Sequence, residues 1–346
     1  MRWNRSLAVS LLLSLWATAA DPARLVHKKK YAMGTTFDIV AYDVSPSHAD
    51  GAIEAAFQQI LRLDGVMSNY RSESDLSWLN RCAHDYACVV SPDLYRVIAE
   101  ALHYSELSNG KFDITVGPLV DYWKAQRNGE RKPSRSEEQH LRDCIGYQRI
   151  RLLAPNRIQF RSPCLALDLG GIGKGYAVDR AVDVLRSFGI TRALINAGNS
   201  TIFAMGSPPG ESAWVVHLRD PSGKVDPQVR LRDNSVSTSE QTAPGVLEDS
   251  GGHIIDPETG APVQASIAIS VIAPTATASD ALSTTLFLLG AENGKRLVDS
   301  LLETAAIWIS PAGQTVVASS GPQIVLRKQG VQQHPDHAAV LQHSTH

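Results

Sequence analysis

The sequence predicts an α+β fold, a single domain of mixed sheets and helices, and three observations lead to this prediction. Segments rich in β-branched and aromatic residues are interspersed along the chain with segments whose apolar residues recur at helical spacing. The 346 residues, of which 43% are hydrophobic, suffice for one large domain or two intimately joined ones. The chain contains no internal repeat.

The strand predictions rest on short β-branched, aromatic or continuously apolar runs bounded by turn residues. Two pairs of runs flank turn sequences, Pro155-Asn156 and Pro311-Ala312-Gly313, and are therefore expected to be hairpins. The predicted strands are, in chain order, 31–42, the hairpin 149–160, 165–169, 193–197, 267–273, and the hairpin of 305–309 with 315–318.

The helix predictions rest on apolar residues at helical spacing, flanked by capping residues. Ser47 and Asp50 resemble a capping box, Ser91-Pro92 is typical of a helix start, and Gly189 is typical of a helix end. The predicted helices are one carrying the apolar positions of 52–61, one from Ser91 to the stop at Asn109-Gly110, and those at 178–188, 280–289 and 292–302. The charged, polar stretch 125–140 is predicted to be an exposed loop.

The two ends of the chain are set apart from the domain. Arg2 and Arg5 precede a short apolar segment, Leu7–Trp16, and small residues follow at 17–19. This pattern is typical of a cleaved secretory signal peptide at 1–20, so the mature protein is expected in the periplasm. No later segment is apolar and long enough to span a membrane. The domain is placed at 21–320, and the polar, histidine-containing segment 321–346 is expected to be a flexible tail.

Charge and cysteine content narrow the class of protein further. A formal net charge of -2 argues against a general nucleic-acid binder. The four cysteines, Cys82, Cys88, Cys144 and Cys164, include no CxxC pair, which argues against a zinc site. Export permits one or two disulfides, with Cys82–Cys88 the easier local pairing, and buried free thiols are the alternative.

The stretch LDLGGIGKGYAVD, residues 167–179, has the composition of a phosphate-binding turn. It lacks the glycine and the Ser or Thr that a P-loop requires, and Tyr176 stands where a dinucleotide-binding fingerprint has its last glycine. Phosphate binding at a helix N-terminus remains possible without either motif. The alternative is a tight strand-to-helix turn that binds nothing.

Asp280 and Thr284 are spaced to share one face of a helix. Two oxygen ligands on one helix face suit Mg²⁺, which prefers oxygen donors. The alternative is that Ser279 caps this helix and Asp280 only complements its dipole. Taken singly, four other stretches also have structural explanations; they carry Met33, Tyr70, Phe112 with Asp113, and His253 with Asp256.

Taken together, these segments resemble one family, the FAD:protein FMN transferases known as the ApbE family. The resemblance extends from about Tyr31 to Ala318 and depends on six segments in a fixed order. These are MGT, MSNYRSESDLS, GKFDITVGPLV, LDLGGIGKGYAVD, HIIDPETG and ASDALSTT. It implies a single ApbE-like domain, related to the T-fold, in which the glycine stretch helps to hold the pyrophosphate of FAD.

The resemblance also implies roles for individual residues. It places magnesium ligands at Asp280 and Thr284, with a backbone carbonyl near Gly171, and a candidate acid/base or phosphate contact at His253; Asp280 and His253 are the candidate catalytic residues. The FAD contacts that it implies fall on Met33, Tyr70, Lys111, Phe112, Asp113, Asp168 and Lys174.

The implied reaction is Mg²⁺-dependent transfer of FMN from FAD to a Thr or Ser hydroxyl of an acceptor protein, with release of AMP. The expected acceptor is a membrane-associated or exported redox protein. Two alternatives remain: hydrolysis of FAD to FMN and AMP, and a non-catalytic flavin-binding protein. The chain departs from the family pattern after GPLV, where DYW begins at Asp121, and at NAGNS, residues 196–200. These departures bear on the acceptor groove or the FAD edge more than on the fold.

Overall fold

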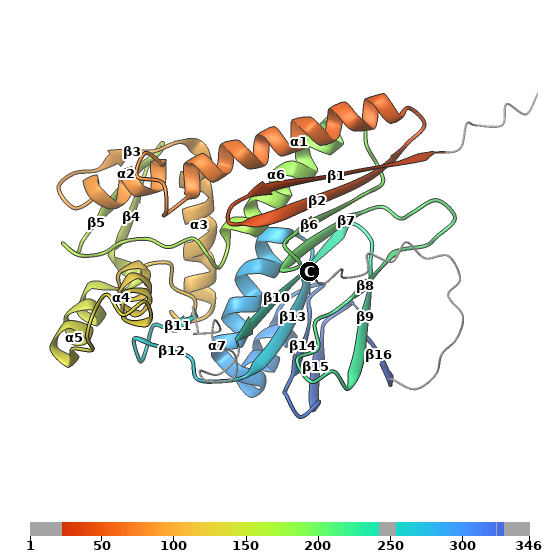
Figure 1. Ribbon diagram of the computed structural model, residues 1–346. Helices are drawn as coiled ribbons and strands as arrows, with labels where there is room; N and C mark the ends of the chain where they lie inside the picture. Colours follow the sequence, from red (N-terminus) through yellow and green to blue (C-terminus); the bar gives the residue numbers. More distant parts are fainter. Residues whose placement is uncertain (1–22, 242–253, 323, 329–346) are drawn as a thin grey trace, which may run out of the picture.

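A central eight-stranded antiparallel sheet organises the computed structural model, which describes residues 23–241, 254–322 and 324–328 (Figure 1). The strand order is β1-β2-β6-β7-β10-β13-β14-β15. The strands are β1 (Arg24–Ala32), β2 (Thr35–Asp43), β6 (Ala193–Ala197), β7 (Thr201–Met205), β10 (Asn234–Gln241), β13 (Ile267–Ala273), β14 (Ala305–Ile309) and β15 (Thr315–Ser319).

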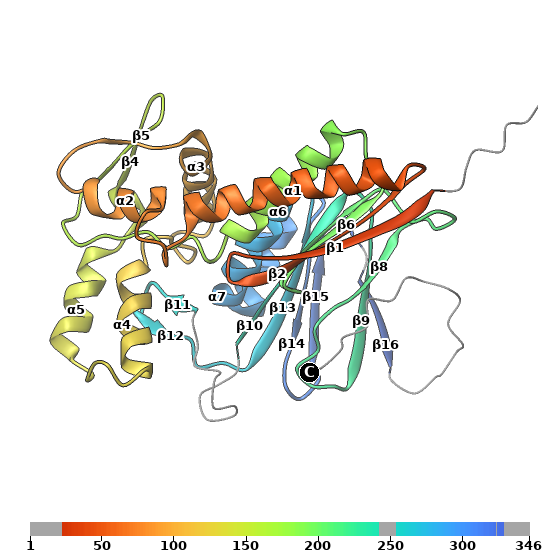
Figure 2. The ribbon, with the colours of Figure 1, turned by 45° about the horizontal axis from the view of Figure 1, so that its top comes forward.

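Each face of this sheet is covered by a different layer (Figures 1 and 2). Three long helices pack on one face: α1 (Pro46–Met67), α6 (Gly173–Ser187) and α7 (Ala276–Ser300). A small sheet, ordered β16-β9-β8, covers apolar residues of the other face. Its strands are β8 (Trp214–His217), β9 (Val225–Leu231) and β16 (Ile324–Lys328).

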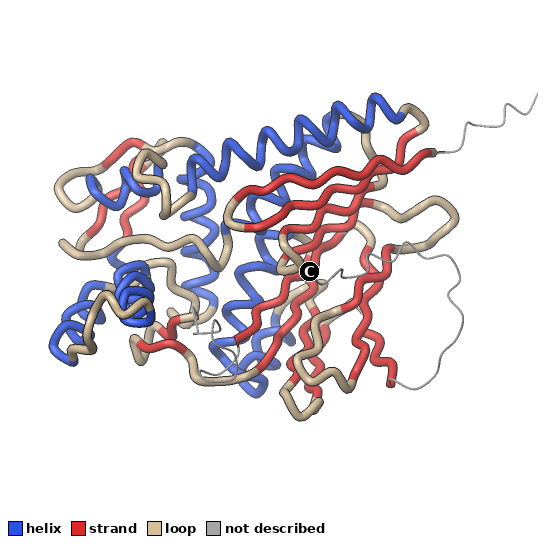
Figure 3. Tube along the Cα trace, viewed as in Figure 1, coloured by secondary structure: helices blue, strands red, loops and turns tan. Residues whose placement is uncertain are grey.

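The remaining elements extend from one end of the central sheet (Figure 3). They form a three-stranded sheet ordered β3-β5-β4, a two-stranded hairpin of β11 with β12, and the helices α2 to α5. The elements are α2 (Asp75–Cys82), β3 (Cys88–Val89), α3 (Pro92–Leu107), α4 (Gly117–Arg127), α5 (Arg135–Cys144), the 3₁₀ turn η1 (Tyr147–Arg149), β4 (Ile150–Leu153), β5 (Arg157–Phe160), β11 (Ile255–Asp256) and β12 (Ala261–Pro262).

The layered arrangement explains why several strands of the central sheet carry apolar residues at successive positions. In β2, Phe37 and Ile39 face the helices, whereas Val40 joins the cluster beneath the small sheet. Successive side chains of a strand point to opposite faces, so a sheet covered on both sides requires apolar residues at odd and even positions. β13 and β14 follow the same rule, and all five residues of β14 are buried.

Several predicted elements are confirmed with their expected limits. α3 begins at Ser91, whose side chain accepts a hydrogen bond from the Leu94 amide. The strands predicted at 193–197 and 267–273 are β6 and β13. The hairpins predicted around residues 155 and 312 are β4 with β5 and β14 with β15.

Two strand predictions are wrong in part. The single strand predicted at 31–42 is instead the hairpin of β1 with β2, because the chain reverses at Met33 and Gly34, both with positive φ. Residues 165–169 form no strand beyond one isolated bridge between Ala166 and Val116. The amide and carbonyl of Leu167 bond to the Asn80 side chain, which takes the place of a neighbouring strand.

Three helix predictions also need correction. The stretch 125–140, predicted as a loop, contains the end of α4 and the first half of α5, two helices whose faces are too polar for an apolar period to reveal. α1 starts at Ser45 rather than at the predicted Ser47, since the Ser45 hydroxyl caps it and Pro46 follows. Helices 280–289 and 292–302 are one element, α7, interrupted at Gly290.

Both possible disulfides are present, Cys82–Cys88 and Cys144–Cys164. No helix among residues that the structure describes is both long and apolar enough to cross a membrane. The predicted signal peptide and His253 lie outside the described residues, so the statements made about them stay predictions. Within the predicted flexible tail, 321–346, residues 324–328 instead form β16, which pairs with β9. Residues 323 and 329–346 lie outside the described residues.

Candidate active site

One cavity of about 720 Å³ brings together nearly all of the residues singled out from the sequence. It lies where the start of α6, the first turns of α7 and the end of β10 meet the loops around residues 111 and 168. The predicted residues that line it are Met33, Tyr70, Lys111, Phe112, Asp113, Asp168, Gly171, Lys174, Asp280 and Thr284. Ile254, Ile255 and Pro257 of HIIDPETG line it as well, so the structure joins all six segments into one site.

The glycine stretch supplies the N-terminus of α6 to this cavity. Its N-cap residue, Ile172, offers no side-chain hydrogen bond to the helix. Lys174 follows within the first turn and lines the cavity, and none of the described carboxylates pairs with its ammonium group. The Gly173 amide donates to the Leu169 carbonyl and the Gly175 amide to the Asp280 carboxylate, so the helix dipole and the Lys174 ammonium group are what favour an anion such as phosphate here.

Asp280 and Thr284 lie on the face of α7 that meets α6 and β10. The buried Asp280 carboxylate accepts a hydrogen bond of 2.8 Å from the Gly175 amide and one of 3.4 Å from the Thr201 hydroxyl. The Thr284 hydroxyl lies 3.4 Å from the Ser239 hydroxyl. A β-carbon added to Gly171 would lie 3.3 Å from Thr284 Oγ1, so the Gly171 backbone adjoins the threonine.

These donors fit a hard divalent cation. The Asp280 carboxylate, the Thr284 hydroxyl and the backbone carbonyl at Gly171 each supply an oxygen atom. Mg²⁺ prefers oxygen ligands and retains several waters when it binds to protein. The alternative explanation for Asp280, a helix cap supplied by Ser279, is wrong. α7 begins one turn earlier, where Thr275 caps it and Asp179 of α6 accepts hydrogen bonds from the Ala276 and Thr277 amides. Asp280 is therefore not needed at the helix start.

Asp113 is held in place by its own hydrogen bonds. One carboxylate oxygen accepts from the Thr115 amide and hydroxyl, and the other accepts from the Tyr147 amide. Burial raises the pKa of Asp113, although these hydrogen bonds oppose the shift. With both oxygens engaged, Asp113 shapes the loop that begins at Lys111 as well as facing the cavity.

Lys111 provides a positive charge that is already paired. Its ammonium group lies 3.2 Å from Asp256 and 2.6 Å from Glu258. Burial lowers the pKa of Lys111, but the hydrogen bonds to these two carboxylates raise it by more, so it stays protonated. The pairing also joins the HIIDPETG segment to the cavity wall.

Three apolar or aromatic groups line the cavity in different ways. Phe112 is buried, whereas Tyr70 is 85% exposed and its ring is free on one side for stacking. The Lys124 ammonium group lies 4.5 Å from the Tyr70 ring centroid. Met33, at the turn between β1 and β2, would lie 3.6 Å from a β-carbon added to Gly173. An exposed tyrosine beside a basic turn is typical of a site for a planar, phosphate-bearing ligand.

A second carboxylate lies close to Asp168. The Asp168 side chain accepts a hydrogen bond from the Gly170 amide and so helps to form the glycine turn. Burial and the Asp168 charge raise the pKa of Asp121, the first residue after GPLV and one of the departures from the family pattern. Asp121 and Asp168 thus place two carboxyl groups near one another beside the cavity.

Sequence reasoning missed one whole wall of the cavity. Thr238, Ser239, Glu240 and Gln241 of β10 line it, together with Arg219 from the loop between β8 and β9. Arg219 and Glu240 form an ion pair. The available signal was the run SVSTSEQ, residues 235–241, in which polar residues occupy a strand buried at the centre of the molecule.

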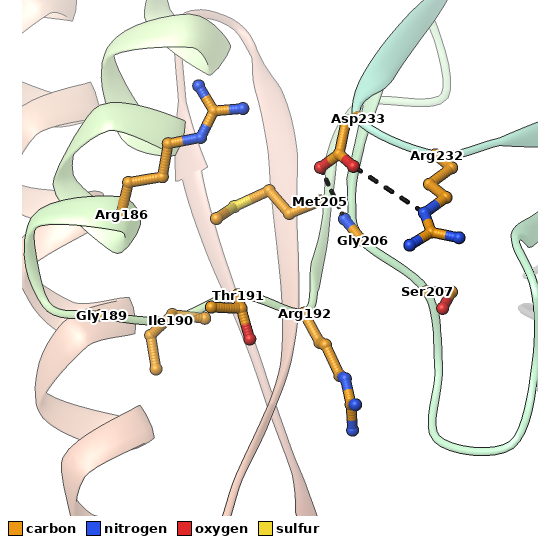
Figure 4. Close-up of a pocket in the computed structure, with 10 residues that line it drawn as sticks. All are labelled: Arg186, Gly189, Ile190, Thr191, Arg192, Met205, Gly206, Ser207, Arg232 and Asp233. Carbon is orange, nitrogen blue, oxygen red and sulfur yellow. Dashed lines mark hydrogen bonds and ion pairs between the residues drawn. The ribbon is translucent and has the colours of Figure 1, made fainter.

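A second hollow, of about 460 Å³, lies at the other end of α6 and contains none of the predicted residues (Figure 4). Arg186, Arg192 and Arg232 line it, but their side chains extend in different directions (Figure 4). Arg232 adjoins Asp233, which also accepts a hydrogen bond from the Gly206 amide. These groups do not converge on one ligand position, so the 720 Å³ cavity is the candidate active site.

The fold and this cavity suit a phosphate-bearing, planar ligand, and the cavity also holds a group of oxygen donors. The chain belongs to the ApbE family, whose model matches residues 33–308. It is 30% identical to the FAD:protein FMN transferase of Treponema pallidum over 92% of this chain and 94% of that protein. It is 29% identical to the FAD:protein FMN transferase of Vibrio cholerae, over 86% and 90% of the two chains.

Solved structures agree with this assignment. The flavin transferase ApbE from Vibrio cholerae superposes with a TM-score of 0.76 at 27% identity, covering 86% of this chain and 98% of that one. The apo form of the Pseudomonas stutzeri flavinyl transferase ApbE gives a TM-score of 0.75 at 27% identity, with 86% and 96% covered. The predicted fold class and family are confirmed.

Proposed function

We propose that this protein transfers FMN from FAD to a Thr or Ser hydroxyl of an acceptor protein, depends on Mg²⁺ and releases AMP. The observation that supports this most is the convergence of Lys174, the N-terminus of α6, Asp280 and Thr284 in one cavity. The names of the relatives describe flavin transfer to protein. The cavity contains the charges and donors that such a reaction requires.

The proposed reaction breaks the phosphoanhydride bond of FAD and forms a phosphoester bond to the acceptor. The acceptor hydroxyl loses its proton and its oxygen bonds to the phosphorus on the FMN side of the pyrophosphate. The bond from that phosphorus to the AMP oxygen breaks, and AMP leaves with the electron pair. Attack and departure lie in line, so most of the catalysis comes from positioning and from stabilising negative charge.

This chain's residues have distinct tasks in the proposal. Lys174 and the positive N-terminal end of the α6 dipole bind the pyrophosphate, and the Tyr70 ring stacks on a planar part of the ligand. Asp280, Thr284 and the Gly171 carbonyl would hold Mg²⁺, which when bound neutralises charge on phosphate oxygens. Gly175 and Thr201 orient the Asp280 carboxylate through their hydrogen bonds. His253 is the proposed proton acceptor or phosphate contact.

The experiment pairs two substitutions in α7. Asp280→Asn retains the size of the side chain but removes its charge, and Thr284→Val retains the shape but removes the oxygen. Each variant is incubated with FAD, Mg²⁺ and a panel of exported redox-protein domains, and the mass of each domain is measured. We expect transfer to fall by at least about a hundredfold in Asp280→Asn, because a hard cation loses its anionic ligand.

The comparison of the two variants tests the metal assignment separately from transfer itself. High Mg²⁺ concentration is expected to restore Thr284→Val in part but not Asp280→Asn. Calorimetric titration of Mg²⁺ gives a second readout that does not depend on activity. Unchanged rates and unchanged Mg²⁺ binding in both folded variants would rule out the cation site. Release of FMN and AMP with no mass gain on any acceptor would favour the alternative, FAD hydrolysis.

A further inference from the structure

Among the described residues, the edge of β10 that faces the cavity has no strand partner beyond Ser237. β7 pairs with β10 only from Asn234 to Ser237, whereas β13 pairs with it as far as Gln241. Among the described residues, no other strand takes the place of β7 along this edge. Gly198, Asn199 and Ser200, where the chain turns away from the edge, line the same cavity as residues 238–241. The space beside the edge is therefore the cavity itself.

The direction of the backbone groups follows from one hydrogen bond. The Thr238 amide donates to the Ser200 carbonyl at 2.7 Å, so the backbone groups of residue 238 point toward β7. Backbone groups alternate in direction along a strand, and those of Glu240 point the same way. The Ser200 amide bonds to Ala197 instead of returning a hydrogen bond to Thr238. The edge thus presents the Thr238 carbonyl and the Glu240 amide and carbonyl to the cavity.

The two faces of β10 differ at this edge. The Ser239 hydroxyl faces α7, 2.8 Å from the Ser283 hydroxyl and 3.4 Å from that of Thr284. Glu240 faces the opposite side, where it pairs with Arg219. A strand added here would present alternate side chains to α7, which carries Asp280 and Thr284, and the intervening ones to Arg219.

We propose that the acceptor protein presents its hydroxyl by binding as an extended strand along this edge of β10. This inference rests on the proposed function, because it names how the acceptor enters that same site. Strand addition gives main-chain hydrogen bonds that do not depend on sequence, and the side chains supply the choice of acceptor. The modified Thr or Ser occupies a position that faces α7, and its two neighbours face Arg219 and Glu240.

The test compares two substitutions of one residue. Glu240→Pro removes the edge amide, and it leaves the bonds to β13 intact because proline is tolerated where a strand's N–H faces outward. Glu240→Ala removes the same side chain and its ion pair with Arg219 but retains the amide. The acceptor is the domain that gains the mass of FMN in the transfer experiment. We expect KM for this domain to rise at least about tenfold more in Glu240→Pro than in Glu240→Ala, with FAD affinity equal in the two.

A second measurement leaves the protein unaltered, should Glu240→Pro fail to fold. The flavin-bearing segment of the acceptor is synthesised with one N-methyl group at each backbone position in turn. Added-strand pairing predicts that KM rises at every second position. Equal KM values for the two Glu240 variants, or N-methyl effects without a period of two, would overturn strand addition. Loss of FAD binding in Glu240→Pro alone would also overturn it, because the flavin would then occupy the edge. Failure of the unsubstituted protein to modify any acceptor refutes the proposed function instead.

Discussion

Replacing Gly175 with alanine tests whether the contact between α6 and α7 sets the geometry of the active site. A β-carbon at this position would lie 2.7 Å from the Asp280 β-carbon and would also overlap the Ala276 carbonyl. Carbon atoms pack at about 3.5–4.0 Å, so the two helices must separate by roughly 1 Å. Such a shift would stretch the hydrogen bond from the Gly175 amide to the Asp280 carboxylate.

The expected loss combines two opposing effects. Overpacking a core costs about 1–3 kcal/mol, and backbone atoms, which make part of this contact, cannot move aside as side chains do. Alanine in a helix recovers up to about 1 kcal/mol relative to glycine. We therefore expect a net loss of roughly 2 kcal/mol in unfolding free energy. A displacement of about 1 Å at a reacting centre costs on the order of a hundredfold in rate.

Denaturant unfolding and FMN transfer measure the two effects, with Gly65→Ala in α1 as the control. No atom lies within 4 Å of a β-carbon added to Gly65, so this variant should gain up to about 1 kcal/mol and retain full activity. A Gly175→Ala protein as stable and as active as the parent would refute the argument that this contact fixes Asp280.

Two further predictions concern stability alone. Burial raises the pKa of Asp93, but Arg62 and the Tyr176 hydroxyl lower it by more, so the net shift is downward from 3.8. The stabilisation is present above that value and is lost as pH falls through the pKa of the folded state. The unfolding free energy is measured against pH for the parent and for Asp93→Asn. At neutral pH the variant should be less stable than the parent by a constant amount, and this difference should disappear below pH 3.8. A difference that grows in acid would contradict the argument. Replacing Cys144 and Cys164 by alanine should cost roughly 3 kcal/mol, against about 2 kcal/mol for Cys82 and Cys88, because the loops span 20 and 6 residues. Chemical denaturation of both double variants checks the order.

The sequence was sufficient where a few adjacent residues decide the local structure. Ser91-Pro92 starts α3, and the apolar runs at 193–197 and 267–273 form strands at those residues, because helix capping and β-propensity act over short distances. The spacing of Asp280 and Thr284 placed both side chains on one helix face for the same reason.

Only the tertiary structure decided which distant segments satisfy one another. Asn80 bonds to both backbone groups of Leu167, so an apolar run that reads as a strand is held outside the sheet. Asp179, on α6, receives the first amides of α7 and moves the start of that helix to Thr275. Because β7 begins only at Thr201, the edge of β10 beyond Ser237 has no strand partner among the described residues and faces the cavity. The neighbouring residues in the sequence predict none of these features. The first two depend on a hydrogen-bond partner from a distant part of the chain, and the third depends on the lack of such a partner.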